Sequence, residues 1–183
     1  NLGGGTSSIR ATQFVGPASV ATYLTADTAP EETAQLPRAK SFVDRPFIIV
    51  LATTDPIATD SFYRSTFKLG GYPPRPVSIG VVARALGLPD DHLTPLGLAT
   101  GAEPVNAIEI DGYPAPALQR SRAPGQLPPA VAMVSFAVAT LDGLDIEFIQ
   151  PPAKLYGERR AATFVGPAGE LTELIETAAG FSQ

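Results

Sequence analysis

The chain has 183 residues, of which 44% are hydrophobic and 17% charged, so it can bury a sizeable core and does not resemble a disordered protein. Its formal net charge of −5 argues against nucleic-acid binding, and no apolar run reaches the roughly 18 residues that cross a bilayer. The absence of cysteine excludes disulfides, thiolate nucleophiles and Cys-ligated metals, and we predict a cytoplasmic protein.

Two segments of the chain are similar to each other at an offset of 150 residues. Residues 10–26 match residues 160–176 without a gap, and both contain the stretch Phe-Val-Gly-Pro-Ala. A Gly-Pro turn between short apolar and β-branched runs predicts a β-hairpin. Because the second hairpin closes a long segment, we interpret residues 1–26 as the end of a preceding, mostly absent pair of modules, followed by a linker over 27–45. Our hypothesis is that a longer polypeptide has lost its N-terminal half.

The elements after the linker are predicted from periodicity and helix signals. The apolar run 47–52 predicts a buried strand. Asp55 and Pro56 predict the start of a helix, because Asp accepts hydrogen bonds from free N–H groups and Pro suits the first helical position. This helix is expected to carry Ile57, Phe62, Tyr63 and Phe67 on one face. A second helix is predicted over 77–88, and two strands, 96–100 and 106–111, are expected to pair across a turn at 101–104.

The same order of elements then starts again. Residues 113–130 are rich in Pro and Ala and predict a segment that crosses between two modules. A strand over 131–138, at most one helical turn at 141–144, a strand at 146–149 and the closing hairpin follow. The sequence therefore predicts two βαβββ-like modules, 46–112 and 131–178, within one unit over 46–180.

Two stretches resemble a known superfamily. Residues 55–64, following a strand, resemble the opening of a vicinal oxygen chelate module, and residues 156–176 resemble its closing hairpin. The superfamily includes glyoxalase I, extradiol dioxygenases and bleomycin-resistance proteins. The resemblance covers about 45–178. It implies an α+β fold in which paired βαβββ modules form a curved mixed β-sheet cup, with helices on the outside and a site on the concave face.

Members of this superfamily usually hold a divalent metal. They use a His or Gln early in the first strand of a module and a Glu in its last strand. Here the early positions fall near Ile48 and Met133, which are not suitable ligands, and the last-strand positions fall on Glu109, Glu173 and, in the first hairpin, Tyr23. Because a metal site normally needs three or more ligands, we predict a protein without a metal cofactor.

The resemblance suggests Glu173 as a general base, since burial on a concave face raises the pKa of a lone carboxylate. Tyr156 or Arg160 would stabilise an enolate-like intermediate, although Arg160 has the alternative of a surface ion pair with Glu158 or Glu176. His92, the single histidine, is a further acid–base candidate, with a solvated or capping role as the alternative. The expected substrate contacts are Glu109, Met133, Ile48, Ser135 and Arg159.

These residues favour a lyase or isomerase that acts on a small apolar or aromatic organic molecule. One alternative is a protein that binds and sequesters a small molecule without changing it, as drug-resistance proteins do. Another is a metal-dependent dioxygenase or glyoxalase whose ligands lie in the missing half. Because the strand edges of the first hairpin would otherwise stay open, we expect association with the missing N-terminal fragment or with a second copy of the chain.

Overall fold

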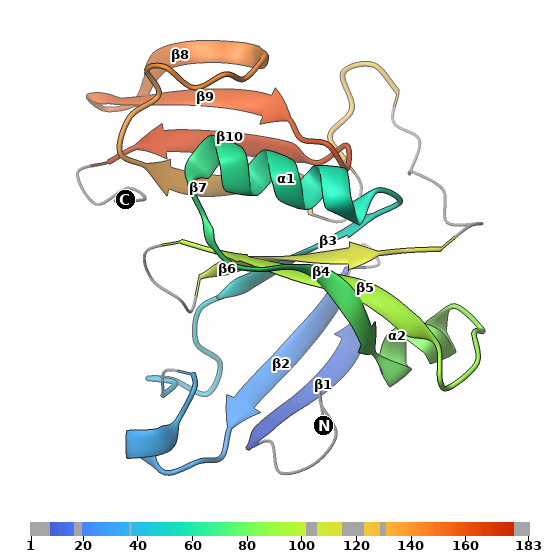
Figure 1. The fold of residues 1–183 in the computed structure, drawn as a ribbon. Coiled ribbons are helices and arrows are strands. Elements are labelled where there is room, and N and C mark those ends of the chain that lie inside the picture. Colours follow the sequence, from blue (N-terminus) through green and yellow to red (C-terminus); the bar gives the residue numbers. More distant parts are fainter. Residues whose placement is uncertain are drawn as a thin grey trace.

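The computed structural model describes residues 8–16, 20–36, 38–101, 106–114, 123–128 and 131–177. In these residues the strands form two four-stranded mixed sheets and one two-stranded sheet, with helix α1 between the two larger sheets (Figure 1). Most of the predicted crossing segment, and the predicted turn after Gly101, lie outside the described residues. No helix in the described part of the chain is long and apolar enough to cross a membrane.

The first module contains β3 (Ile48–Thr53), α1 (Pro56–Phe67), β4 (Gly70–Ser78), α2 (Gly80–Ala85), β5 (Leu93–Thr100) and β6 (Ala107–Gly112). Its strands lie in the order β3-β6-β5-β4, with β3 and β6 parallel and the other pairs antiparallel. Helix α1 begins where the sequence predicts it. The side chain of Asp55 accepts a hydrogen bond from the Ala58 amide at 3.0 Å, and Pro56 takes the first helical position.

The segment between α1 and β5 differs from the predicted helix over 77–88. Val77 and Ser78 belong to β4, and α2 is limited to Gly80–Ala85. The sequence interpretation missed β4 because this strand contains three prolines, which cannot donate hydrogen bonds to a neighbouring strand. The prolines are tolerated because β4 lies at the edge of its sheet.

The second module consists of β7 (Val134–Val138), β8 (Phe148–Tyr156), β9 (Arg159–Val165) and β10 (Leu171–Glu176). Its strand order, β7-β10-β9-β8 with β7 and β10 parallel, repeats the order of the first module. Residues 139–147, all described, contain no helix, in keeping with the prediction of at most one turn. The structure thus confirms an α+β fold of paired modules, with the long helix only in the first.

Helix α1 packs against both modules and gives them a shared core. Phe62 and Phe67 contact the buried residues of both sheets, and their ring centroids lie 5.8 and 6.4 Å from that of Phe164 on β9. The hydroxyl of buried Tyr63 donates a hydrogen bond to Glu170, in the turn between β9 and β10. Ile57 was predicted on the same face but is exposed, because about 100° of rotation per residue carries it away from the other three.

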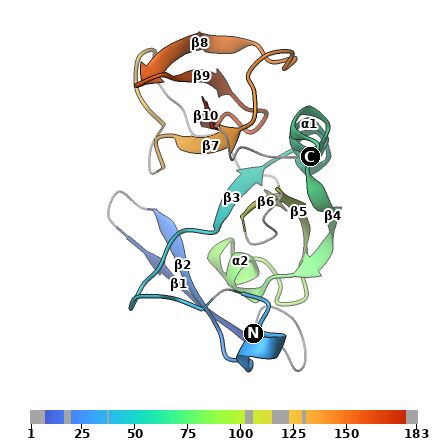
Figure 2. The same cartoon turned by 90° about the vertical axis from the view of Figure 1, so that its left-hand side faces the viewer.

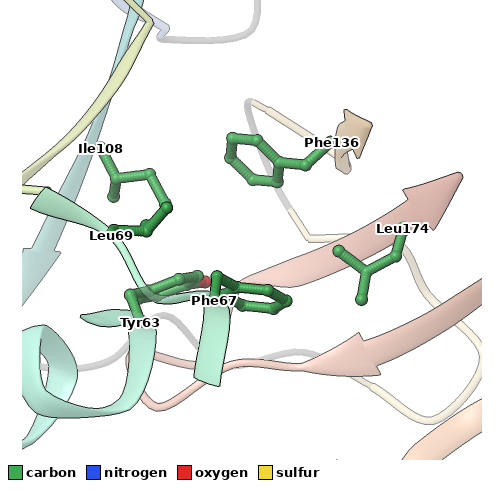
Figure 3. Close-up of a pocket in the computed structure, with 6 residues that line it drawn as sticks. All are labelled: Tyr63, Phe67, Leu69, Ile108, Phe136 and Leu174. Atoms are coloured by element: carbon green, nitrogen blue, oxygen red, sulfur yellow. The ribbon is translucent and has the colours of Figure 1, made fainter. Parts of the chain in front are cut away.

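A small gap remains between the modules. Figure 3 shows the side chains around it: Tyr63, Phe67, Leu69, Ile108, Phe136 and Leu174. Its volume of about 10 Å³ is no larger than one water molecule requires. The gap therefore belongs to the core and is not a ligand pocket.

The N-terminal hairpin consists of β1 (Ile9–Val15) and β2 (Ala21–Asp27), and no third strand joins it in the described part of the chain. The strand ends on either side of its turn match those of β9 and β10 at the offset of 150 residues seen in the sequence. Strands β1 and β9 end at Val15 and Val165, and β2 and β10 begin at Ala21 and Leu171. The two similar segments therefore form hairpins of matching register.

The carboxylate of Asp27 anchors the segment after the hairpin. It accepts hydrogen bonds from the hydroxyl of Ser8 and from the amides of Ala29, Gln35 and Leu36, at 2.6 to 3.2 Å. These bonds hold its pKa well below the usual range, with the Ser8 hydroxyl as the largest cause. The predicted linker over 27–45, which includes a 3₁₀ helix at Glu31–Thr33, is thus tied back to the hairpin at its start.

Candidate functional site

The alternation of side chains along a strand separates the two faces of each larger sheet. In the second sheet Leu174 packs into the core with α1, so its neighbour Glu173 points to the opposite face. In the first sheet Ile110 faces α1, whereas Glu109 and Asp111 point away from it. We call the face opposite α1 the far face of each sheet. The hairpin β1–β2 and α2 lie on the side of the first far face (Figure 2).

Glu173 is held on the far face of the second sheet by two side chains. Ser135, directly opposite it on β7, donates a hydrogen bond to Oε2 at 2.6 Å, and the hydroxyl of Tyr156 donates one to Oε1 at 2.8 Å. Glu173 is only 4% exposed, so the carboxylate is reached from outside through its partners. The structure brings together three of the residues that the sequence singled out.

Tyr156 is the exposed member of this group. The guanidinium carbon of Arg159 lies 5.9 Å from the centroid of its ring, which places a positive charge beside the phenol. The hydrogen bond to Glu173, followed by the charge of that carboxylate, raises the pKa of Tyr156. The phenol is therefore protonated at neutral pH and serves as a donor toward Glu173.

Arg160 does not join this group, contrary to the expectation that it would act beside Glu173. Consecutive residues of a strand point to opposite faces, and Arg160 shares the α1 side with Ala162. Its guanidinium pairs with Asp142 at 2.7 Å and with Glu176 at 3.6 Å. The alternative interpretation, an ion pair that includes Glu176, describes its position.

The remaining predicted residues are dispersed. His92 lies in the loop between α2 and β5, where its amide donates to the Pro89 carbonyl at 3.0 Å, and so belongs to the first module. Ile48 begins β3 opposite Ala107, and Met133, just before β7, is exposed. These positions give no acid–base contact with Glu173.

The donor set does not fit a divalent metal ion. In the described residues, no three His, Cys, Asp or Glu side chains converge in a way that could hold one. Both oxygens of Glu173 already accept hydrogen bonds, and the first-strand positions Ile48 and Met133 offer no hard ligand. We therefore derive no chemistry from a bound metal.

A second group of titratable residues lies on the far face of the first sheet. Asp111 is 3% exposed, and its Oδ1 has no hydrogen-bond partner in the described part of the chain. Burial, and after it the charge of Glu109, raises the pKa of Asp111 to about 7, and burial also raises the pKa of Glu109. Asp111 thus changes its protonation state near neutral pH, as proton-transfer groups do.

Two tyrosines complete this second group. Burial, followed by the charges of Asp111 and Glu109, raises the pKa of Tyr113. Burial also raises the pKa of Tyr23 on β2, and smaller contributions come from Tyr113 and the two carboxylates. Sequence reasoning named Glu109 alone as a site residue. The alternation of residues 109, 111 and 113 is the signal that unites three of them, and the resemblance places Tyr23 at the last-strand position that Glu109 also holds.

Comparison with known proteins gives a likeness of fold. No family model and no curated protein matches the sequence. A solved glyoxalase family protein from Bacillus cereus aligns with a TM-score of 0.54 and 20% identity, over 76% of this chain and 98% of that chain. An antibiotic binding protein from a Streptomyces species has a TM-score of 0.47 and 11% identity, over 74% and 98% of the two chains. A lactoylglutathione lyase from Agrobacterium tumefaciens has a TM-score of 0.44 and 16% identity, over 75% and 98%.

Proposed function

The chain has the vicinal oxygen chelate fold of the glyoxalase family proteins, and from this premise we propose that it is a lyase or isomerase that works without a metal ion. Its substrate is a small apolar or aromatic organic molecule with an acidic C–H bond beside a carbonyl group. The reaction takes place on the far face of the second sheet. Tyr156 contacts the substrate, and Glu173 is the base behind it.

The observation that carries this proposal is the hydrogen bond from Tyr156 to Glu173. It joins a phenol on the surface to a carboxylate that is 4% exposed, so a proton can pass from outside to a group that solvent does not reach. Ser135 fixes the other carboxylate oxygen and so sets the direction of Oε1. Arg159, beside the phenol ring, supplies a positive charge to an enolate oxygen.

The proposed step moves two protons in a relay and conserves the net charge. The substrate C–H proton passes to the oxygen of Tyr156 while the phenolic proton passes to Oε1 of Glu173, which leaves an enolate and a neutral Glu173. Return of the proton to another carbon completes an isomerisation. In an elimination, the leaving group departs from the β-carbon with its bonding electrons and takes a proton from Tyr156, while Glu173 returns its proton to Tyr156.

Exchange of deuterium from solvent tests this step without knowledge of the natural substrate. A panel of aryl ketones that carry an α C–H bond is incubated with the protein in D2O, and NMR follows the loss of the α-proton signal. Glu173→Gln keeps an acceptor for Tyr156 but cannot take a proton, and Tyr156→Phe removes the relay. Each should slow exchange by about 100-fold or more.

Ser135→Ala is a graded comparison, because it removes the hydrogen bond that orients the carboxylate but leaves both groups of the relay in place. It should retain exchange within about tenfold of the wild-type rate. Thermal denaturation of each variant establishes that the fold is kept. Deuterium exchange at the wild-type rate in the Glu173→Gln variant would rule out Glu173 as the base.

Binding without turnover is the second candidate, and the burial of Glu173 favours it. A carboxylate whose two oxygens already accept hydrogen bonds can orient Tyr156 toward a ligand without accepting a proton. In this case a bound aryl ketone is recovered unchanged. Calorimetry then gives the same affinity for the wild type and Glu173→Gln, and a weaker one for Tyr156→Phe.

A dioxygenase or glyoxalase with metal ligands from outside this chain is a third possibility. Elemental analysis of the purified protein distinguishes it from the other two. A stoichiometric transition metal would contradict the proposal of a metal-free enzyme.

A further inference from the structure

The two similar hairpins differ in what covers them. Phe14 and Leu24 of the first hairpin occupy the places of Phe164 and Leu174 in the second, at the offset of 150 residues. Phe164 and Leu174 are each 1% exposed, whereas Phe14 is 44% and Leu24 is 42% exposed. Side chains that form the core of one hairpin therefore lie on the surface of the other. We call this exposed side of β1–β2 the outer face of the hairpin.

Elements of both modules cover the equivalent face and edges of the second hairpin. Phe62 and Phe67 of α1 pack on Phe164, β7 adds to β10 in parallel, and β8 adds to β9 antiparallel. In the described part of the chain, β1 and β2 form a sheet of two strands with no strand on either outer edge. The open edge of β2 thus corresponds to the edge of β10 that pairs with the parallel strand β7. The open edge of β1 corresponds to the edge of β9 that pairs with the antiparallel strand β8.

The apolar side chains and the two open strand edges therefore specify the same kind of partner, a segment that covers the first hairpin as 131–158 covers the second.

We propose that the outer face and both edges of hairpin β1–β2 bind a protein segment of the β7–β8 type, made of two strands joined by a connection. One strand adds parallel to β2, the other adds antiparallel to β1, and their apolar side chains cover Phe14 and Leu24. This is binding by strand addition. The inference does not depend on the proposed reaction, since it concerns the other end of the molecule.

A second copy of the hairpin fits these edges less well. A two-fold axis that brings two identical strand edges together in one sheet makes them antiparallel, whereas the place of β2 in a module requires a parallel neighbour. Such a dimer also leaves the edge of β1 or of β2 unused.

The experiment uses the full chain and a synthetic polypeptide of residues 131–158 as the probe. Fluorescence anisotropy of the labelled probe measures binding, and hydrogen exchange locates it. We expect saturable one-to-one binding with slower exchange in β1 and β2. Phe14→Lys and Leu24→Lys should each weaken binding at least tenfold, whereas Ile57→Lys, at an exposed apolar position on α1, should leave it unchanged.

Four results would overturn the inference. One is the absence of binding to the wild-type chain, and another is equal binding by Phe14→Lys. The third is protection of β9 and β10 in place of β1 and β2, which would mean that the probe exchanges with its own counterpart. Self-association of the chain that Phe14→Lys abolishes would identify a second copy as the occupant and also contradict the proposal. Circular dichroism of each variant checks that it is folded.

Discussion

Neighbouring residues in this protein have opposite surroundings. Glu173 is on the far face with Ser135 and Tyr156, while Leu174 beside it is part of the core with α1. Arg159 lies by the ring of Tyr156, while Arg160 pairs with Asp142 on the other face. The surroundings of each side chain therefore depend on which face of the sheet it points to more than on its residue type.

Asp111 makes the stability of the protein depend on pH. Its pKa in the folded chain, about 7, lies above the ordinary value of 3.8, so the folded state binds the proton more tightly than the unfolded state. The stabilisation is complete below the unfolded pKa and is lost as the pH rises toward 7. Asp111→Asn should flatten this dependence and raise the free energy of unfolding at pH 8 by about 1–3 kcal/mol. Urea denaturation at pH 5 and pH 8 measures it.

Asp142→Asn is the control for this experiment, because its pKa is shifted in the other direction. The hydrogen bond from Arg160 lowers the pKa of Asp142, so the contribution of Asp142 is the same at pH 5 and pH 8 and disappears only under strong acid. Burial also raises the pKa of Glu109, so Glu109 too reduces stability as the pH rises. Both the wild type and the Asp111→Asn variant contain Glu109, so it does not account for a difference between them. An Asp111→Asn variant with the wild-type pH profile would contradict the assignment.

Among the elements, β4 departs furthest from the sequence interpretation. Its prolines lie on an edge strand, and a backbone irregularity between Tyr72 and Arg75 shifts its register against β5. Gly71 has φ of +88°, and a Cβ atom there would lie 1.9 Å from the carbonyl oxygen of Leu98. The strand can therefore pair with β5 only when residue 71 has no side chain.

Replacement of Gly71 tests this constraint. Gly71→Ala should destabilise the protein by about 3 kcal/mol or more, because the new methyl group forces β4 away from β5. Gly87→Ala is the matched control, since Gly87 also has positive φ, +65°, but nothing lies within 4 Å of a Cβ atom there. It should cost only about 1 kcal/mol, from backbone strain. Equal losses in chemical denaturation of the two variants would show that the close approach to Leu98 has no effect.

At the scale of the whole molecule, one helix joins two sheets. Phe62 and Phe67 reach both hydrophobic clusters, and Tyr63 donates a hydrogen bond to Glu170 in the second module. Burial raises the pKa of Glu170, whose Oε2 has no partner in the described residues. The second module has no helix of its own between β7 and β8, so its core depends on α1 from the first.

This shared core predicts that the two modules lose stability together. Phe62→Ala should destabilise the protein by about 3 kcal/mol, because it removes a ring that packs on both hydrophobic clusters. Tyr63→Phe should cost about 1–3 kcal/mol, because it removes one hydrogen-bond donor from the partly buried carboxyl group of Glu170. Hydrogen exchange should show the same loss of protection in β6 and β10. Ile57→Ala, an exposed change on the same helix, should alter stability by less than about 0.5 kcal/mol. Loss of protection in one sheet alone would contradict a shared core.

Local signals in the sequence predicted much of the fold. The Asp55-Pro56 pair located the start of α1, and the Gly-Pro stretches located both hairpins, because these residues restrict the backbone wherever they occur. The same local reasoning failed at 77–78, where a proline-containing strand is permitted only by its place at the edge of a sheet. The predicted module boundaries, the absence of a cofactor and the cytoplasmic location remain predictions.

The sequence by itself determined the start of α1 and the correspondence of the two hairpins, since these depend on turn residues and periodicity within short segments. It also singled out Glu173, Tyr156 and Ser135. Only the tertiary structure decided that they meet, that Arg160 faces the other way, and that Tyr23 lies near Asp111. Contacts between distant elements depend on how the sheets and α1 pack, and no local preference of the backbone specifies that packing.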